Sequence, residues 1–323
     1  MGGRAAAWSV VAAAAVLLAG GAAASGRSAG SSSVILGKIH LGTREIGLAG
    51  ACSAIATGPS AIGWNPAGLA DTERTSVEVL HVEQGESVRI ENVLAAQPLL
   101  RGLVVGGSAS YLNQPPLPEI AEINGEPVAT GRDLAAYQYK GALGVAQALA
   151  GLGDVETLGE IWSKGAVGAA VNVLGERIGG AGGVSAALDL GYRYEDANEG
   201  RSAALVVRDL GTPVRGRPIP VAGQAGFGQR IADWNFSMDF LTAVDDVFRL
   251  RAGVEWTYTM ESGGVTLRGG AQHSFSSDLI APLAAGLGYR FALPGGFEFT
   301  LEYAWSPVRG FSDLQAASIR VAL

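Results

Sequence analysis

The stretch that decides the fold is "FRLRAGVEWTY", residues 248–258. Apolar side chains alternate along it with polar residues or glycine, so that Leu250 and Trp256 fall on one side and Arg251 and Glu255 on the other. Side chains on a β-strand point to opposite faces in turn, whereas those on a helix repeat every 3.6 residues. The stretch therefore predicts a strand with one apolar and one polar face.

The same alternation recurs from about residue 74 to the end of the chain, for example in "LDLGYRYE" (188–195), "NFSMDFLT" (235–242) and "FEFTLEYAW" (297–305). About fourteen strands are predicted, near residues 74–83, 86–97, 102–112, 136–149, 163–176, 182–195, 201–210, 218–230, 234–243, 247–259, 263–275, 282–294, 296–305 and 314–323. Most connections are short. The exceptions are a Pro-rich loop at 113–135, a segment at 150–162 that suits a short helical turn, and a loop near 211–218.

So many consecutive strands favour closure, because a large open sheet leaves unpaired edges. Strands of about ten residues joined by short turns on one side and longer loops on the other are typical of outer-membrane barrels. We therefore expect an all-β fold, an antiparallel up-and-down transmembrane β-barrel. The alternative is one or two soluble secreted β-sandwiches, whose strands also alternate. The 48 glycines of the chain speak against it.

In such a barrel the apolar faces point outward and the polar faces line the interior. The charged residues expected inside are Asp189, Arg193, Asp239, Arg249, Arg251, Glu255, Arg268, Arg290, Glu298 and Glu302. Acids and bases are mixed among them, so many can pair across strands. Four tryptophans near predicted strand ends suit an aromatic girdle, namely Trp162, Trp234, Trp256 and Trp305.

The N-terminus has the features of an export signal. Arg4 precedes the apolar run "AAAWSVVAAAAVLLAG", and Ala22–Ala24 offers a small-residue cleavage site. The predicted organisation is a signal peptide at 1–24, a flexible leader at 25–33, a plug segment at 34–72 and the barrel at 73–323. The expected location is the bacterial outer membrane, reached after cleavage of the signal peptide.

Composition and motifs argue against several function classes. The net charge is −7, which disfavours nucleic-acid binding because that needs basic patches. Cys52 is the single cysteine, so no intrachain disulfide is possible, and we expect it to be a small buried residue. His40, His81 and His273 have no second ligand at metal-binding spacing. Neither a nucleophile elbow nor a phosphate-binding loop occurs, so we expect no catalytic site, metal or cofactor, and no enzyme.

A second stretch carries a family resemblance. "LGTREIGLAGACSAIATGPSAIGWNPAGLA", residues 41–70, resembles the N-terminal signature of PorV/PorQ-type proteins, a branch of the FadL-like outer-membrane barrels. The matching positions are Gly42, Arg44, Gly47, Gly50, Ala51, Asn65, Pro66, Ala67, Gly68 and Leu69. Later segments such as "GAVGAAVNVLGERI" and "AGLGYRF" follow in the order of that family's strands, so the resemblance covers most of the mature chain.

The resemblance implies a fourteen-stranded barrel with a luminal hatch, and it assigns the plug and turn motif to Gly42, Arg44, Gly47, Gly50, Asn65, Pro66 and Gly68. Small residues let the backbone approach the wall, and Asn65–Pro66 makes a firm turn. Two functions stay open. One is a passive channel for hydrophobic or amphipathic small molecules. The other is an accessory or shuttle barrel of a type IX-like secretion system that holds secreted proteins, with the loop 113–135 as contact surface. Either would sit in outer-membrane lipid.

Overall fold

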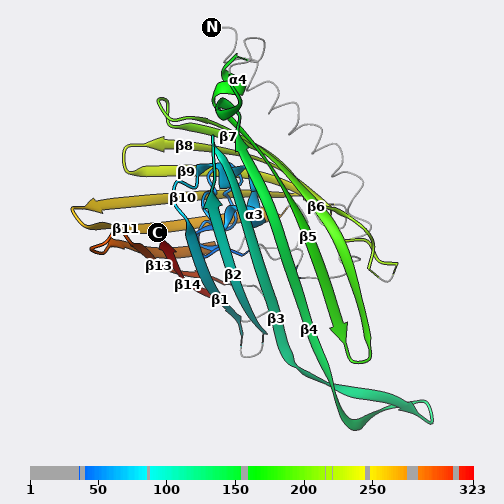
Figure 1. The fold of residues 1–323 in the computed structure, drawn as a ribbon. Coiled ribbons are helices and arrows are strands. Elements are labelled where there is room, and N and C mark those ends of the chain that lie inside the picture. Colours follow the sequence, from blue (N-terminus) through cyan, green and yellow to red (C-terminus); the bar gives the residue numbers. More distant parts are fainter. Residues whose placement is uncertain are drawn as a thin grey trace.

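The computed structural model describes residues 36, 41–85, 88–153, 159–214, 216–219, 221–243, 248–274, 283–307 and 313–323. The predicted signal peptide, the leader and His40 lie outside them. Within these residues fourteen strands form one closed antiparallel barrel, in which each strand pairs with its sequence neighbours and β1 pairs with β14 (Figure 1). The strands are β1 Ser76–Gln84, β2 Val88–Pro98, β3 Leu103–Ile123, β4 Glu126–Ala148, β5 Gly165–Ile178, β6 Ala181–Asp196, β7 Arg201–Gly211, β8 Ala222–Ile231, β9 Trp234–Ala243, β10 Arg249–Met260, β11 Gly263–Ser274, β12 Leu283–Ala292, β13 Glu298–Ser306 and β14 Leu314–Ala322. The predicted fourteen-stranded barrel is confirmed, and the sandwich alternative is wrong.

The two ends of the barrel differ. At one end β1 begins opposite the last residues of β14, with Ser76 facing Ala322, and tight turns join β6 to β7, β8 to β9 and β10 to β11. We call this the short-turn end. One longer connection also lies there and contains the 3-10 helix η4 (Leu149–Leu152) and the helix α4 (Gly159–Ser163). The helical turn predicted at 150–162 is thus confirmed. The opposite end carries most of the longer connections and is called the long-loop end.

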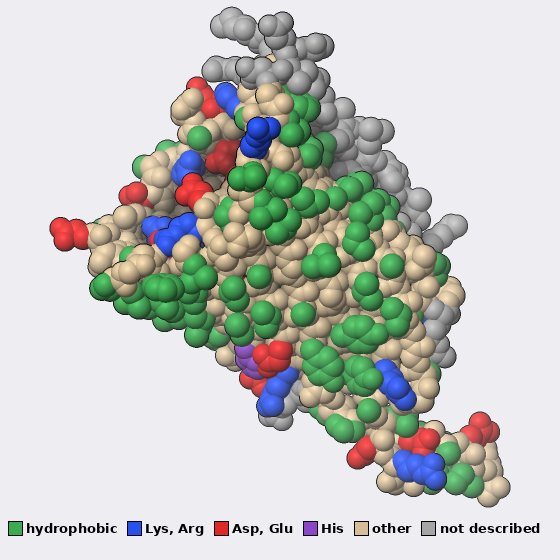
Figure 2. Space-filling view, viewed as in Figure 1, with side chains coloured by type: hydrophobic (Ala, Val, Ile, Leu, Met, Phe, Trp, Pro, Cys, Tyr) green, Lys and Arg blue, Asp and Glu red, His purple; other side chains and the backbone are tan. Residues whose placement is uncertain are grey.

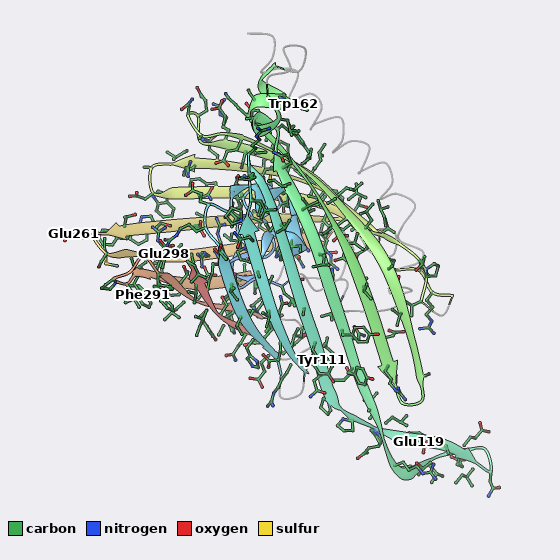
Figure 3. The ribbon with its side chains drawn as sticks, viewed as in Figure 1. Tyr111, Glu119, Trp162, Glu261, Phe291 and Glu298 are labelled. Atoms are coloured by element: carbon green, nitrogen blue, oxygen red, sulfur yellow. The ribbon has the colours of Figure 1, made fainter. Side chains whose placement is uncertain are left out.

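The two faces of the wall follow the predicted alternation. Along β1 the residues alternate between buried and exposed, with Glu78 fully buried and Val79 53% exposed. Figure 2 shows hydrophobic side chains spread over the outer wall and charged ones gathered toward its ends. Trp234 and Trp256 face each other on β9 and β10 near the short-turn end. Trp162 differs from the prediction: it lies in α4, outside the strands (Figure 3).

The prediction of a Pro-rich loop at 113–135 is wrong. β3 and β4 run on through it as a two-stranded ribbon that projects from the long-loop end (Figure 1). Among the described residues, β3 after Asn113 and β4 before Ala136 have no strand partner except each other. A proline lacks the N–H that a ladder needs, but strands without an outer neighbour tolerate it. The ladder is irregular between Gln114 and Leu117, where two prolines stand.

The barrel is filled by residues 41–72, which we call the inner segment. It contains the helices α2 (Thr43–Gly47) and α3 (Ala61–Trp64) and the 3-10 helix η3 (Pro66–Asp71). α2 contacts β11–β14, whereas η3 contacts β3–β6 on the other side of the lumen. None of the helices in the described residues is long and apolar enough to cross a membrane.

Candidate functional site

The inner segment has its own apolar core, which packs against small side chains of the wall. Leu48, Ile62, Trp64 and Leu69 are buried, and so is Cys52, as predicted. The wall residues of the same cluster are mostly alanines, namely Ala96, Ala142, Ala146, Ala170 and Ala204, together with Leu94 and Val104. Small side chains on the wall leave room for the large ones of the segment.

Glycines of the wall bring the segment closer still. At nine inward glycines of the described strands an added Cβ would come within 3.2 Å of an atom of the inner segment, at or below the tightest ordinary contacts. These are Gly106, Gly144, Gly168, Gly191, Gly226, Gly228, Gly253, Gly270 and Gly286. Six of them form three directly opposed cross-strand pairs, Gly106 with Gly144, Gly168 with Gly191, and Gly253 with Gly270. The wall therefore has three bare patches of backbone on which the segment rests.

The glycines of the sequence motif lie on the other side of this contact. The Cα of Gly286 on β12 would lie 3.1 Å from an added Cβ at Gly47, and the carbonyl oxygen of Ala56 would lie 2.1 Å from one at Gly68. Gly50 has φ +77°, in the left-handed region that favours glycine. At Gly42 an added Cβ would lie 2.1 Å from a carboxylate oxygen of Glu45. An added side chain would press on wall backbone at Gly47 and on segment backbone at Gly68, strain the backbone at Gly50 and displace the Glu45 carboxylate at Gly42.

Asn65 and Pro66 form the turn that starts η3. The fully buried Asn65 accepts a hydrogen bond from the Ala67 N–H at 3.1 Å through Oδ1. Its Nδ2 donates to the carbonyl oxygens of Ser53 at 2.8 Å and Tyr192 at 3.4 Å. Pro66 fixes φ at the first position of the helix, where no N–H is needed. The turn thus ties two parts of the segment to each other and to β6.

Arg44 connects the segment to a chain of ion pairs on the wall. Its Nε and Nη2 both donate to the carboxylate of Glu255, each at 3.0 Å, and its Nη1 donates to the Ile55 carbonyl at 3.0 Å. Glu255 also pairs with Arg268 at 2.6 Å, and Arg268 continues to Glu302 at 2.9 Å. Burial alone would lower the pKa of Arg44, but Glu255 raises it above its usual value. Arg44 is therefore a permanent charge on the segment.

Two more charged side chains of the wall bind the backbone of the segment. The carboxylate of Asp239 accepts from the N–H groups of Cys52 and Ser53, both at 2.9 Å. Arg193 donates from Nε to the Ala54 carbonyl at 2.8 Å and also pairs with Asp71, at the end of η3. Burial raises the pKa of Asp71. The sequence predicts that both wall residues face inward, but it gives no sign that their partners are main-chain groups of the segment.

The half of the lumen toward the long-loop end is aliphatic. We define the aliphatic cluster as the buried residues Leu36, Leu41, Leu80, Val82, Ile90, Leu112, Leu174, Ala187, Val214, Ile219, Ala304 and Ala316. Most come from inward positions of the strands, and two come from the connection between β7 and β8. The expectation that the inward face is polar throughout is therefore wrong at this end of the barrel. A useful signal was present: inward positions of β1 change from Glu78 to Leu80 and Val82 along the strand.

The opposite end of the lumen holds a polar cavity of about 570 Å³. Residues of the inner segment line one side of it, among them Arg44 and Asp71, and the short-turn ends of β6–β9 line the other, among them Arg193 and Arg230. The lumen is therefore graded along its axis, from aliphatic at the long-loop end to charged at the short-turn end.

Within the described residues no three His, Cys, Asp or Glu side chains lie close enough together to hold an ion. His81 pairs with Glu91 at 2.7 Å on the outer surface.

Neither a family model nor a curated protein matches the sequence. Solved structures do match its fold. The Pseudomonas putida toluene transporter TodX aligns over 87% of this chain and 96% of its own, at 11% identity and a TM-score of 0.57. A Pseudomonas aeruginosa FadL homologue aligns over 86% of this chain and 97% of its own, at 8% identity and a TM-score of 0.53.

The chain has the fold of a FadL-like barrel. At such low identity the likeness concerns the fold alone, and the PorV/PorQ branch suggested by residues 41–70 stays a prediction. The number of strands and the closure of the barrel are features of the shared fold. The graded lumen and the contacts of the inner segment are features of this chain's own side chains.

Proposed function

We propose that this protein is a passive outer-membrane channel for hydrophobic or amphipathic small molecules. The observation that carries the proposal is the aliphatic cluster, which fills the lumen at the end where longer loops would face the outside. Buried Leu80, Ile90 and Leu174 on the inner wall do not favour the passage of water and ions. An apolar molecule, in contrast, is stabilised when it leaves water for such a surface. The toluene transporter that shares the fold supports this choice.

The inner segment acts in this proposal as the hatch between the two halves of the lumen. It separates the aliphatic cluster from the polar cavity at the short-turn end. The charged lining of that cavity offers an apolar molecule no favourable surface, so a molecule that passes the segment is released rather than held. Movement of the segment requires that contacts such as Arg44–Glu255 part or shift.

The outer wall supports the membrane location. Apolar side chains such as Leu143, which is 75% exposed, would be costly in water and favourable in lipid. In outer-membrane barrels the short turns face the periplasm, which puts the polar cavity on that side. The predicted signal peptide at 1–24 supplies the export that this location needs.

An uptake assay tests the channel. The full mature chain is reconstituted in liposomes, and entry of the apolar fluorophore 1-N-phenylnaphthylamine into an internal binding protein is followed against protein-free vesicles. We expect faster entry with the protein, and a slower rate for Leu80→Asn, which places an amide in the aliphatic cluster. His81→Asn is the matched control, because the next residue of β1 faces outward and is exposed. Equal rates with and without protein would refute the channel.

A second function is favoured by one observation, the projecting β3–β4 ribbon. It exposes Leu117, Ile120, Ile123 and Val128 beyond the barrel wall. We propose as the alternative that the protein is an accessory barrel that holds secreted proteins through this ribbon. Deleting residues 115–131 and recovering proteins from mild detergent tests it. Loss of a stoichiometric secreted partner would support the alternative, and unchanged recovery would count against it.

A further inference from the structure

A belt of polar side chains crosses the lumen between the aliphatic cluster and the inner segment. Consecutive strands contribute Asn92, Ser110, Lys140, Asn172, Asp189, Arg208, Gln224, Asp239, Arg251 and Gln272, from β2 to β11. Several of them stand directly opposite each other, such as Asn92 and Ser110 or Asp239 and Arg251. The other belt residues on adjacent strands are not directly opposite each other but lie two residues away from the opposed position, so their side chains remain neighbours on the inward face.

Much of this belt is already satisfied. Ser110 donates to Asn92 at 3.0 Å, and Arg251 donates to Gln272 at 3.0 Å. The backbone of the inner segment satisfies Asp239. These groups therefore hold the inner segment in place or join neighbouring strands of the wall.

The part of the belt on β5–β7 is different, and we call Asn172, Asp189, Arg208 and Asp209 the polar quadrant. Asn172 is 1% exposed, and neither its amide oxygen nor its amide nitrogen has a hydrogen-bond partner among the described residues. Arg208 is equally buried. Its Nε and Nη2 have no partner in the described part of the chain, and its Nη1 makes one long bond of 3.4 Å to the Trp64 carbonyl. Buried polar groups are almost always paired, so the unpaired atoms on β5 and β7, on either side of Asp189, need an explanation.

The backbone is bent to build this quadrant. The pairing of β6 with β7 shifts between Leu188 and Leu190, and Asp209 adopts φ 57°, which is uncommon for a residue other than glycine. As a result the consecutive residues Arg208 and Asp209 are both buried, although a regular strand would turn one of them outward. The Asp209 N–H donates to Asp189 at 2.7 Å, which fixes the bend. Bulges that re-aim side chains are common next to binding sites.

The polar quadrant borders the aliphatic cluster. Leu174 lies two residues from Asn172 on the same face of β5, and Ala187 stands directly opposite Asn172 on β6. We propose that the quadrant binds the polar head of an amphipathic molecule whose hydrocarbon part takes the place of the aliphatic cluster. The inference rests on the proposed channel function and names its substrate class. The quadrant is closed in this conformation, so binding requires that the cluster parts.

The chemistry of the quadrant selects the head group. Its unpaired atoms include donors, on Arg208 and Asn172, and acceptors, on Asn172 and Asp209. Two carboxylates, Asp189 and Asp209, also face a ligand there. Arg208 would attract a carboxylate ligand, but such a ligand could only accept hydrogen bonds, and the two acids that would repel it outnumber the one arginine of the quadrant. A neutral hydroxyl or amide both donates and accepts, so the site suits an alcohol, phenol or amide of a small hydrocarbon.

Competition binding tests this inference. The full mature chain in nanodiscs is loaded with 1-N-phenylnaphthylamine, and hexane, 1-hexanol and hexanoate are compared as competitors after correction for partitioning into the lipid. We expect 1-hexanol to compete about tenfold or more better than hexane, because two paired hydrogen bonds are gained, and hexanoate to compete worst. Asn172→Leu, which keeps the size of the side chain, should lose most of the preference for 1-hexanol while hexane competes as before.

Controls separate the possible failures. Ser110→Ala changes a belt residue outside the quadrant and should keep the preference, and heat-modified electrophoretic mobility shows that each barrel is folded. If hexane and 1-hexanol compete equally in the unaltered protein, or if Asn172→Leu keeps the preference, the quadrant does not bind the head group although the channel stands. If no competitor displaces the fluorophore and the uptake assay also fails, both proposals are wrong.

Discussion

Gly270 is the position at which a single methyl group should displace the inner segment. An added Cβ there would lie 2.3 Å from the carbonyl carbon of Leu48, 2.5 Å from its oxygen and 2.6 Å from the nitrogen of Ala49. All three are backbone atoms of the segment, so no side-chain rotation relieves the contact. We therefore expect Gly270→Ala to act on the docked segment rather than on the barrel.

The magnitude follows from the size of the overlap. Carbon atoms in contact prefer a separation of about 3.5 Å, so the backbone at Leu48 must retreat by about 1 Å. Overpacking of this kind costs about 1–3 kcal/mol. A destabilisation of the docked state by about 2 kcal/mol, with the undocked state unchanged, raises the ratio of undocked to docked protein about thirtyfold.

The chain carries its own probe for this change. Cys52 is the single cysteine, lies in the inner segment and is buried, so a maleimide reacts with it only when the segment leaves its place. Labelling of Gly270→Ala should therefore be about thirtyfold faster than that of the unaltered protein. Gly269→Ala is the matched control on the outer face of the same strand, where an added Cβ finds its nearest neighbour at 3.9 Å. If the two variants label at the same rate, the glycine contact does not hold the segment.

Four further predictions concern the same segment and the ribbon. Glu255→Gln leaves two largely buried arginine side chains without their shared carboxylate, a loss of about 3–5 kcal/mol, and should speed Cys52 labelling more than Gly270→Ala does. Asn65→Asp should label faster than Asn65→Ala, because it buries a charge against two carbonyl oxygens, and the reverse order would refute that role. Burial raises the pKa of Glu45 to about 6 from 4.5, so the docked segment loses about 2 kcal/mol as pH rises through that interval. Labelling, normalised to free cysteine at each pH, should thus be faster at pH 7 than at pH 4.5, and Glu45→Gln should remove the difference. Deleting residues 115–131 should leave the heat-modified mobility of the barrel unchanged, because beyond the wall this ribbon pairs only with itself.

The strands and their faces could be predicted from the sequence because the decisive signal is local. On β10 the alternation from Leu250 to Trp256 fixes which side chains turn outward, whatever the rest of the chain does. Closure then follows from the number of strands and the cost of open edges. The ribbon differs from the predicted loop because proline ends a strand only where its missing N–H is needed, and a strand without an outer neighbour tolerates it.

The contacts of the interior were not predictable in the same way. The sequence shows that Arg44 belongs to a motif and that Glu255 faces inward, but 211 residues separate them, and their bidentate pairing depends on where the segment lies. Asp239 presents the same difficulty, because its partners are N–H groups, which every residue except proline carries. The bend at Asp209 gives no local signal, since the pattern of β7 reads as an ordinary strand.

The opposed glycines of the wall indicate that the inner face of the barrel and the inner segment are complementary in shape. Cross-strand side-chain pairs stabilise a sheet, and glycine is depleted in strands because it makes none. Yet Gly168 faces Gly191 beneath the Asn65–Pro66 turn, and Gly253 faces Gly270 beneath Leu48. Each pair weakens the wall at a place where a side chain would collide with the segment. The lost stability is recovered only when the segment is in place, so a barrel without residues 34–72 should be less stable than the whole protein.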